Sequence, residues 1–452
     1  MEKPVRQKIK ILLLAFGFAG AGTIWARRIT RALEQAPSEA MASTYRRVDW
    51  WILSARCAQL RKVLLVVCGP QNKLYPIEDV SPMDDRGHGL LADMVALTQS
   101  RPFDKADIVR VNIWINAVGI LLLALVFLLC GMPWAGFLSL MVGSCYGIPG
   151  PIMSADAQAT FFGEYCLIIL PIPWVVQLAY HRIARWRLII AGSLSWAALT
   201  WALLLREAIG LIGIACTGLF VVIVFLYSKP KTWKIYCRYG FHLFFGILIL
   251  MSNSIILSVR DRWLNLPPAY LIKSHGIAHA FHQGLGTEPN SWGIQYDDTN
   301  GAEAAIKINP QAIFGTPLYY VEMRRLYLDI LRRYPLQVAA IYWRKFKKTL
   351  ALPLQFAGIS IMWYVLGVTC ALPFLLQPSR SPSVSVIVIL AMEVTLGVFL
   401  LQGVFIIPRP IFLYPAKFGT LLLLMGLADA GMDWVFDRKR RRSLDSASRE
   451  RS

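Results

Sequence analysis

Residues 111–155, VNIWINAVGILLLALVFLLCGMPWAGFLSLMVGSCYGIPGPIMSA, contain no Asp, Glu, Lys or Arg. A helix needs about 20 apolar residues to cross the ~30 Å hydrocarbon core of a bilayer. The stretch is therefore long enough for two crossings. Cys130-Gly131-Met132-Pro133 contains the helix breakers glycine and proline and marks the expected turn between the two crossings. These residues predict an integral membrane protein.

Similar apolar runs recur along the chain. The first covers residues 9–26 and follows the basic residues Lys3, Arg6, Lys8 and Lys10. The others cover residues 161–180, 188–205, 208–228, 239–259, 350–376, 384–407 and 411–434. Together with the two crossings in 111–155, they predict an all-α integral membrane protein with about ten transmembrane helices.

The composition agrees with this class. Hydrophobic residues make up 56% of the 452 residues and charged residues only 16%, whereas a soluble domain carries about 25% charged residues. A soluble enzyme is therefore excluded. The formal net charge is +20, but the basic residues do not gather in one soluble domain, so we expect no nucleic-acid partner.

The distribution of Lys and Arg predicts the orientation. Short loops at 181–187 and 229–238 and the tail 435–452 are basic, whereas the loop 149–160 has no Lys or Arg. By the positive-inside rule, the basic loops and both termini are cytoplasmic. This pattern is typical of a multi-pass protein of the bacterial inner membrane. The basic residues from Arg344 to Lys348 do not fit, because they adjoin the eighth span on its outer side.

These boundaries divide the chain into six parts. They are the first transmembrane helix (1–26), an outer juxtamembrane segment (27–110), a six-helix core (111–259), a small and mainly helical outer domain between the seventh and eighth spans (260–349), three further helices (350–434) and a basic cytoplasmic tail (435–452). The start of the juxtamembrane segment is basic and amphipathic, and we expect it to lie flat on the membrane surface. Cys57 and Cys68 in this segment could pair if it faces an oxidising compartment.

Carboxylates gather on the predicted outer side. Asp84, Asp85 and His88 lie in the juxtamembrane segment, Asp156 and Glu164 flank the start of the fourth span, and Glu207 follows Arg206 in a tight turn. A carboxylate at the membrane edge can remove a proton from a hydroxyl group, and two of them could bind a divalent cation. The alternative is structural, because Asp-Arg-Gly commonly forms a surface turn.

The predicted outer domain offers a second set of candidates. His275, His279 and His282 share one face of a short helix, but such histidines bind substrate or backbone more often than zinc, and we predict no metal site. Further on, Trp292 could stack on a sugar and Asp297 could bind its hydroxyl groups. The alternative for this second pair is a loop packed on its own domain. We expect His279, Trp292 and Asp297 to contact an acceptor.

Basic residues on the outer side are candidates for phosphate binding, since arginine makes bidentate contacts with phosphate. They are Arg206, Arg409, Arg344 and Lys345. The alternative is ordinary anchoring of helix ends to lipid. Within the membrane, Glu393 lies near the middle of the ninth span, where an ionisable residue is a candidate functional group.

This layout resembles the GT-C superfamily of polytopic membrane glycosyltransferases, which includes protein O-mannosyltransferases and the aminoarabinose transferase of lipid A. The resemblance depends on the acidic motif Asp84-Asp85, on Asp156 in the second outer loop, on the outer turn Arg206-Glu207, and on the outer insertion after the seventh span. It implies a GT-C module and a sugar donor linked to polyprenyl phosphate. Asp84 or Asp85 would deprotonate the acceptor, and Asp156 would be a second active-site acid.

The resemblance leads to a functional hypothesis. The protein would move a sugar from the polyprenyl-phosphate donor to a glycolipid, glycan or protein acceptor on the outer face of the membrane. His88, Glu164 and Glu207 would contribute to the substrate site, and no cofactor is required beyond a possible divalent cation. The alternatives are a transporter or flippase for a lipid-linked glycan or another anionic lipid, and a non-catalytic subunit of an envelope-assembly complex. No GxxxxGK[ST] motif is present, which makes an ATP-driven pump improbable.

Overall fold

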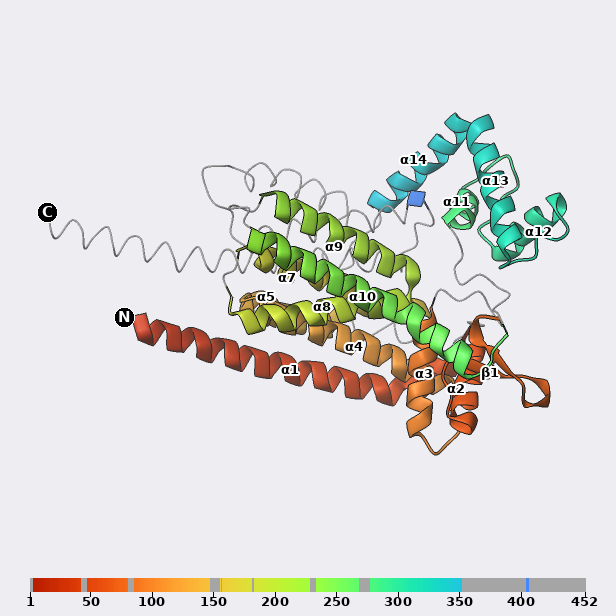
Figure 1. Ribbon diagram of the computed structural model, residues 1–452. Helices are drawn as coiled ribbons and strands as arrows, with labels where there is room; N and C mark the ends of the chain where they lie inside the picture. Colours follow the sequence, from red (N-terminus) through yellow and green to blue (C-terminus); the bar gives the residue numbers. More distant parts are fainter. Residues whose placement is uncertain are drawn as a thin grey trace.

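The computed structural model describes residues 3–41, 47–79, 85–146, 155, 157–180, 183–227, 233–267, 277–351 and 404–405. Most of these residues are helical (Figure 1). The helices of the first part are α1 (Lys3–Met41), α2 (Arg47–Arg61), α3 (Arg86–Thr98), α4 (Lys105–Leu129), α5 (Pro133–Tyr146), α6 (Phe161–Ile169), α7 (Pro171–Tyr180), α8 (Arg185–Leu205), α9 (Glu207–Tyr227) and α10 (Trp233–Trp263). The short strands β1 (Val66–Cys68) and β2 (Leu74–Pro76) form an antiparallel hairpin.

Three segments of the described residues are long and apolar enough to cross a membrane. They are Lys105–Leu129, Phe161–Leu178, which runs from α6 into α7, and Arg185–Leu205. These segments support the prediction of an α-helical membrane protein. The predicted eighth, ninth and tenth spans fall outside the described residues, apart from Leu350, Ala351, Val404 and Phe405.

The predicted break between the second and third helices is confirmed. Helix α4 ends at Leu129, α5 begins at Pro133, and Gly131 between them has a φ of +77°. This left-handed conformation favours glycine, because a Cβ atom would be strained there. The turn after α8 is also where the sequence predicted it, since α8 ends at Leu205 and α9 begins at Glu207.

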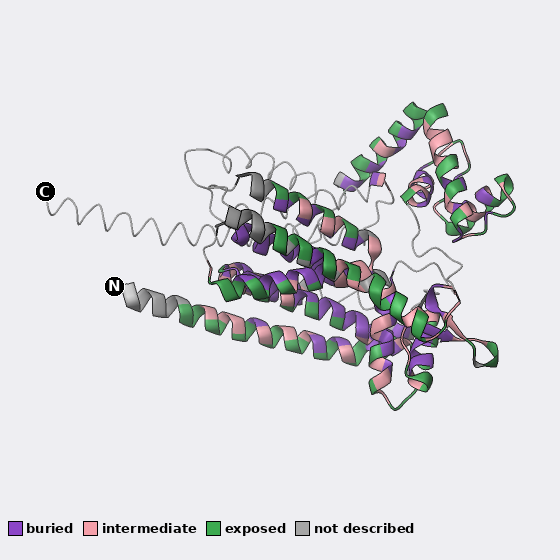
Figure 2. Ribbon diagram, viewed as in Figure 1, coloured by how far each residue is buried: buried purple, intermediate pink, exposed green. Residues whose placement is uncertain are grey.

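Helices α4 and α8 form the centre of the first part. Helix α4 packs against α1, α5 and α6, and α8 packs against α6, α7, α9 and α10 (Figure 1). The buried side chains lie between these helices, and large apolar side chains are exposed on the outer faces of α1 and α10 (Figure 2). Phe16 on α1 is 70% exposed and Phe241 on α10 is 64% exposed. Exposed apolar surface of this kind is expected where a helix faces lipid.

The juxtamembrane segment differs from its prediction. Helix α1 does not end at residue 26 but continues to Met41, and Ala32, Ala36 and Ala40 on this extension are buried. The spacing of four residues places these small side chains on one helical face that packs against protein. In α2, Trp51 is completely buried. The expectation that these residues lie flat on the membrane surface is therefore not met.

Helix α2, the hairpin and α3 form a compact unit at one end of the first part (Figure 1). A disulfide joins Cys57 on α2 to Cys68 on β1, with a Cα–Cα distance of 5.6 Å. Arg260 near the end of α10 donates to the carboxylate of Glu78 over 3.1 Å and to the carbonyl oxygen of Leu65 over 2.9 Å. These contacts fix the far end of α10 to the unit.

Four more helices form a second cluster, the α11–α14 cluster. They are α11 (Ile277–Leu285), α12 (Asp298–Ile308), α13 (Pro317–Arg333) and α14 (Pro335–Ala351). These helices agree with the prediction that residues 260–349 are mainly helical. The cluster has two small apolar cores, one around Leu285 and Val338 and the other around Tyr319 and Met323.

Candidate functional site

The start of α3 meets the turn between α8 and α9. Gly87 allows this approach, because a Cβ atom at this position would lie 2.8 Å from the backbone nitrogen of Leu205. The contact brings Asp85, the residue before α3, to the end of the molecule where Arg206 and Glu207 form their turn. Asp85 is completely buried. Two of the predicted candidate groups are thereby brought together.

A chain of polar side chains connects α3 to α6. The hydroxyl group of Thr160 donates to Glu164 over 2.5 Å, and the Nε2 atom of His88 lies 3.1 Å from the same hydroxyl oxygen. Because the single hydroxyl proton of Thr160 points to Glu164, the Nε2 atom of His88 must be the donor in the second contact. His88, Thr160 and Glu164 are all completely buried. The ring of His88 also stacks on Trp51, with 5.0 Å between the ring centroids.

Arg206 reaches the same region from α8. Its guanidinium carbon lies 4.6 Å from the ring centroid of Phe161, the residue that follows Thr160. A cation over an aromatic face is attracted to it electrostatically, so this contact holds the guanidinium group of Arg206 next to the start of α6. We call Asp85, His88, Thr160, Glu164 and Arg206 the α3–α6–α8 cluster.

Asn116 on α4 holds the backbone of this cluster. Its side-chain nitrogen donates to the carbonyl oxygen of Ala159 over 2.8 Å, and its oxygen accepts from the backbone nitrogen of Gly163 over 2.7 Å. Both contacts are buried. They fix the first turn of α6, on which Glu164 lies, against α4.

Several predicted site residues lie outside the part of the chain that the structure describes. Asp84, Asp156, Arg409 and Glu393 lie outside the described residues. Their predicted roles therefore stay predictions. The structure brings together Asp85, His88, Glu164 and the Arg206-Glu207 turn.

The α11–α14 cluster contains the other candidates at separate positions. His279 is buried, with its Nδ1 atom 2.7 Å from the hydroxyl oxygen of Tyr319 and its Nε2 atom 3.3 Å from Asp298. Asp297 is the N-cap of α12 and accepts from the backbone nitrogen of Thr299. The ring of Trp292 packs on Tyr334, at 5.7 Å between the centroids. In the structure these side chains make contacts within the α11–α14 cluster and stabilise it.

The nearby histidine is also buried. Burial and the neighbouring His279 lower the pKa of His282 to about 4. His282 is therefore neutral at physiological pH. His275, the third histidine of the predicted set, lies outside the described residues. Within the described residues, no group of three or more His, Cys, Asp or Glu side chains is placed to hold a metal ion.

The basic residues in the second half of α14 have partners within the chain. Glu288 is almost completely buried, and Lys348 donates to it over 2.6 Å, while the Nε atom of Arg344 lies 3.8 Å from its second oxygen. Lys345 is fully buried and donates to the carbonyl oxygen of Gly284 over 2.8 Å. Burial lowers the pKa of Lys345 to about 7, although Glu288 acts in the opposite direction.

The sequence did not single out Thr160, Trp51, Asn116 or Glu288. Thr160 lies in the predicted loop 149–160, and its spacing of one helical turn from Glu164 did not by itself distinguish it. The contacts of Asn116 and Trp51 depend on tertiary packing and left no signal in the sequence.

Comparison of the chain with protein-family models, with curated proteins and with solved structures gives no match.

Proposed function

We propose that the protein is a membrane glycosyltransferase that moves a sugar from a polyprenyl-phosphate donor to an acceptor hydroxyl group. The observation that carries the proposal is the convergence of carboxylates, an imidazole and a guanidinium in the α3–α6–α8 cluster. These groups come from segments far apart in the sequence. Such a set combines a base for a hydroxyl group with a cation for a phosphate leaving group.

The proposed reaction assigns a role to each group. Asp85 takes the proton of the acceptor hydroxyl as its oxygen attacks the sugar carbon. The bond between that carbon and the phosphate oxygen breaks, and polyprenyl phosphate leaves with its charge held by Arg206. The contact between His88 and Thr160, together with that between Thr160 and Glu164, keeps the imidazole oriented beside the base. Glu207 and the undescribed Asp84, Asp156 and Arg409 would complete the site.

The proposal includes the orientation predicted from the loops. The chain would cross the bacterial inner membrane ten times with both termini cytoplasmic, and the α11–α14 cluster would be an outer domain. His279, Trp292 and Asp297 would contact the acceptor only after this domain changes its internal contacts. Arg344 and Lys345 would likewise have to exchange Glu288 or Gly284 for a donor phosphate. Arg206 is therefore the better supported phosphate ligand.

The test uses the full chain in its own host membranes. If the enzyme is inactive, its lipid-linked donor accumulates, and mass spectrometry of lipid extracts detects a polyprenyl-phosphate sugar. We expect Asp85→Asn and Arg206→Gln to raise this lipid at least about tenfold, as for loss of a general base or of a charge-stabilising group. Asp49→Asn is the matched control, because Asp49 lies in the same segment with a side chain that is 61% exposed.

The outcome distinguishes the candidate functions. Unchanged donor levels in both site variants, at normal protein abundance, would contradict the glycosyltransferase proposal. A transporter makes a different prediction. Purified protein in liposomes would then move a fluorescent lipid-linked sugar between leaflets without forming a glycosidic product.

A further inference from the structure

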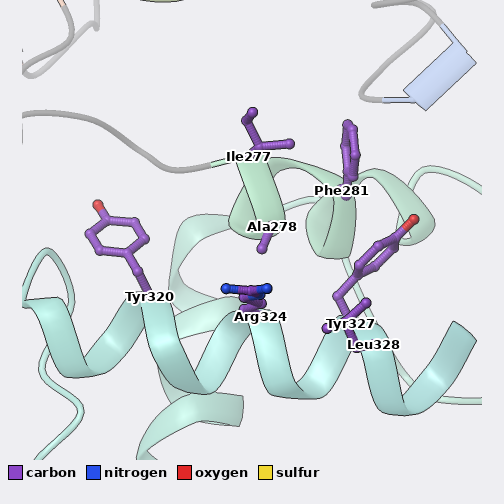
Figure 3. A pocket seen from close by; sticks show the side chains of 7 residues that line it. All are labelled: Ile277, Ala278, Phe281, Tyr320, Arg324, Tyr327 and Leu328. Carbon is purple, nitrogen blue, oxygen red and sulfur yellow. The ribbon is translucent and has the colours of Figure 1, made fainter.

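A groove lies between α11 and α13. It has a volume of about 390 Å³ and is open on one side. Figure 3 shows its lining, with α11 on one wall and α13 on the other. The lining residues are Ile277, Ala278, Phe281, Tyr320, Arg324, Tyr327 and Leu328.

One cation lies among these apolar and aromatic side chains. Arg324 is one turn from Tyr320 on one side and one turn from Tyr327 on the other, so all three share a face of α13. Figure 3 shows the guanidinium group of Arg324 between the two tyrosine rings. The hydroxyl group of Tyr327 is hydrogen-bonded to that of Tyr342 over 2.9 Å, so the groove offers the positive charge of Arg324 beside an apolar and aromatic wall. A ligand that matches it has an anionic head and an apolar body.

The charge of Arg324 is not neutralised within the cluster. Two other arginines of α13 pair with carboxylates on their own helix, namely Arg325 with Glu322 at 3.9 Å and Arg333 with Asp329 at 2.8 Å. Arg324 has no such ion pair among the residues that the structure describes. The helix therefore presents a single unneutralised guanidinium to the groove.

The surroundings of the groove are those of a membrane interface. Phe281 on its wall packs against Phe405 with 5.5 Å between the ring centroids, and Phe405 belongs to the predicted ninth span near its outer end. Helix α14 leads into the predicted eighth span, and its rings Trp343 and Phe346 stack on each other and are exposed. Aromatic and basic side chains are typical of the headgroup region of a bilayer.

We propose that this groove binds one anionic glycerophospholipid of the outer leaflet. The lipid phosphate contacts the guanidinium group of Arg324, and the start of an acyl chain lies along Ile277, Phe281 and Leu328. The bound lipid attaches the α11–α14 cluster to the membrane surface. This site is separate from the α3–α6–α8 cluster and does not depend on the proposed transferase activity.

Native mass spectrometry of the full chain in detergent tests the proposal. The protein is titrated with phosphatidylglycerol or with phosphatidylcholine that carries the same acyl chains. We expect one phosphatidylglycerol to bind about tenfold more tightly than phosphatidylcholine, and Arg324→Gln to remove most of this preference, as for loss of one charge-assisted phosphate contact. Arg325→Gln is the matched control, because it removes the same charge from the adjacent residue outside the groove.

A second variant tests the apolar half of the site. Ala278→Leu fills the groove and leaves Arg324 in place, so it should weaken phosphatidylglycerol binding without changing the net charge. Equal losses in Arg324→Gln and Arg325→Gln would overturn the proposal, as would equal binding of both lipids to the unchanged protein. Displacement of the lipid by millimolar inorganic phosphate would also overturn it, because it would indicate a simple anion site.

Discussion

Glu288 is the buried residue that most changes the interpretation of the nearby basic sequence. It is 4% exposed, and an isolated carboxylate at that burial would be strongly destabilising. Lys348 and Arg344 supply its counter-charges from α14. The basic residues that violate the positive-inside pattern therefore have a structural reason within the chain. Their predicted role in phosphate binding stays a separate hypothesis.

Asp93 on α3 is also a buried carboxyl group, but the partners that the structure shows for it are hydrogen-bond donors and not cations. It is completely buried and accepts from the backbone nitrogen of Leu65 over 2.6 Å and from the hydroxyl group of Ser54 over 3.1 Å. Burial raises its pKa to about 7, and the two hydrogen bonds only partly oppose this effect. The folded protein therefore favours the protonated carboxyl group at mildly acidic pH.

This raised pKa predicts the sign of a pH effect. Between about pH 4 and pH 7 the unfolded chain ionises Asp93 while the folded chain keeps the proton, so the contribution of Asp93 to stability falls as the pH rises. The fall should be at most about 4 kcal/mol, since each tenfold change in proton affinity is worth about 1.4 kcal/mol. Asp93→Asn should remove it, measured as Tm of the detergent-solubilised protein between pH 4 and pH 8.

Asp49→Asn is the control for this experiment, because Asp49 is exposed. The difference in Tm between the unchanged protein and Asp93→Asn should shrink or reverse as the pH rises. A difference that is constant over this range would show that Asp93 titrates normally.

At the scale of elements, the sequence predicted helix ends well where charged residues, glycine or proline mark them. The boundaries at Leu129, Pro133 and Leu205 lie within a few residues of those expected from apolar runs and turn residues. It failed between residues 27 and 79, where α1 continues and a short hairpin forms, although it did offer the pairing of Cys57 with Cys68. In this segment the structure depends on small alanines and Trp51 that are buried against other elements. Composition does not reveal such tertiary contacts.

The candidate site was predictable to a similar extent. Asp85 and Glu164 were candidates as carboxylates on the predicted outer side, and Arg206 was a separate candidate for phosphate binding; the resemblance to GT-C glycosyltransferases joined Asp85 and Arg206 in one expected site. Thr160, which joins His88 to Glu164, was missed because a lone threonine in a predicted loop carries no distinctive pattern. The side chains that meet in the candidate site are set by how closely the helices pack. Single residues at the helix crossings determine that packing.

The crossing of α4 and α6 provides a test of such packing. A Cβ atom at Gly163 would lie 2.6 Å from the carbonyl oxygen of Ile115 and 2.7 Å from the Cα atom of Asn116. Gly163→Ala must therefore push the two backbones apart, which should cost about 1–3 kcal/mol. We expect a lower Tm and, since Asn116 also holds the first turn of α6, accumulation of the lipid-linked donor.

Gly20→Ala on α1 is the matched control, because a Cβ atom there meets nothing within 4 Å. Alanine is the better helix former, so this variant should be as stable as the unchanged protein or slightly more stable. Equal Tm values for the two alanine variants would contradict the close approach of α4 and α6.

At the scale of the whole molecule, the net charge of +20 divides into parts with different physical meanings. The loops 181–187 and 229–238 and the tail carry charge that orients the chain. The cations of α14 neutralise Glu288, and Arg206 and Arg324 lie in two separate candidate sites. The Cys57–Cys68 disulfide adds an independent indication, because disulfides persist in oxidising compartments. It supports the proposed location of the α2–α3 unit on the outer side, which the charge pattern also predicts.

This orientation predicts the accessibility of two exposed residues. Ser291 lies in the α11–α14 cluster and Ala184 precedes α8 in a basic loop, and both are exposed. A membrane-impermeant maleimide should label Ser291→Cys in intact spheroplasts but Ala184→Cys only after permeabilisation. The unchanged protein gives the background from its own thiols. Labelling of both variants from outside would contradict the predicted topology. Protection of Ser291→Cys in intact spheroplasts would contradict it too, and it would also rule out an outer-leaflet lipid in the α11–α14 groove.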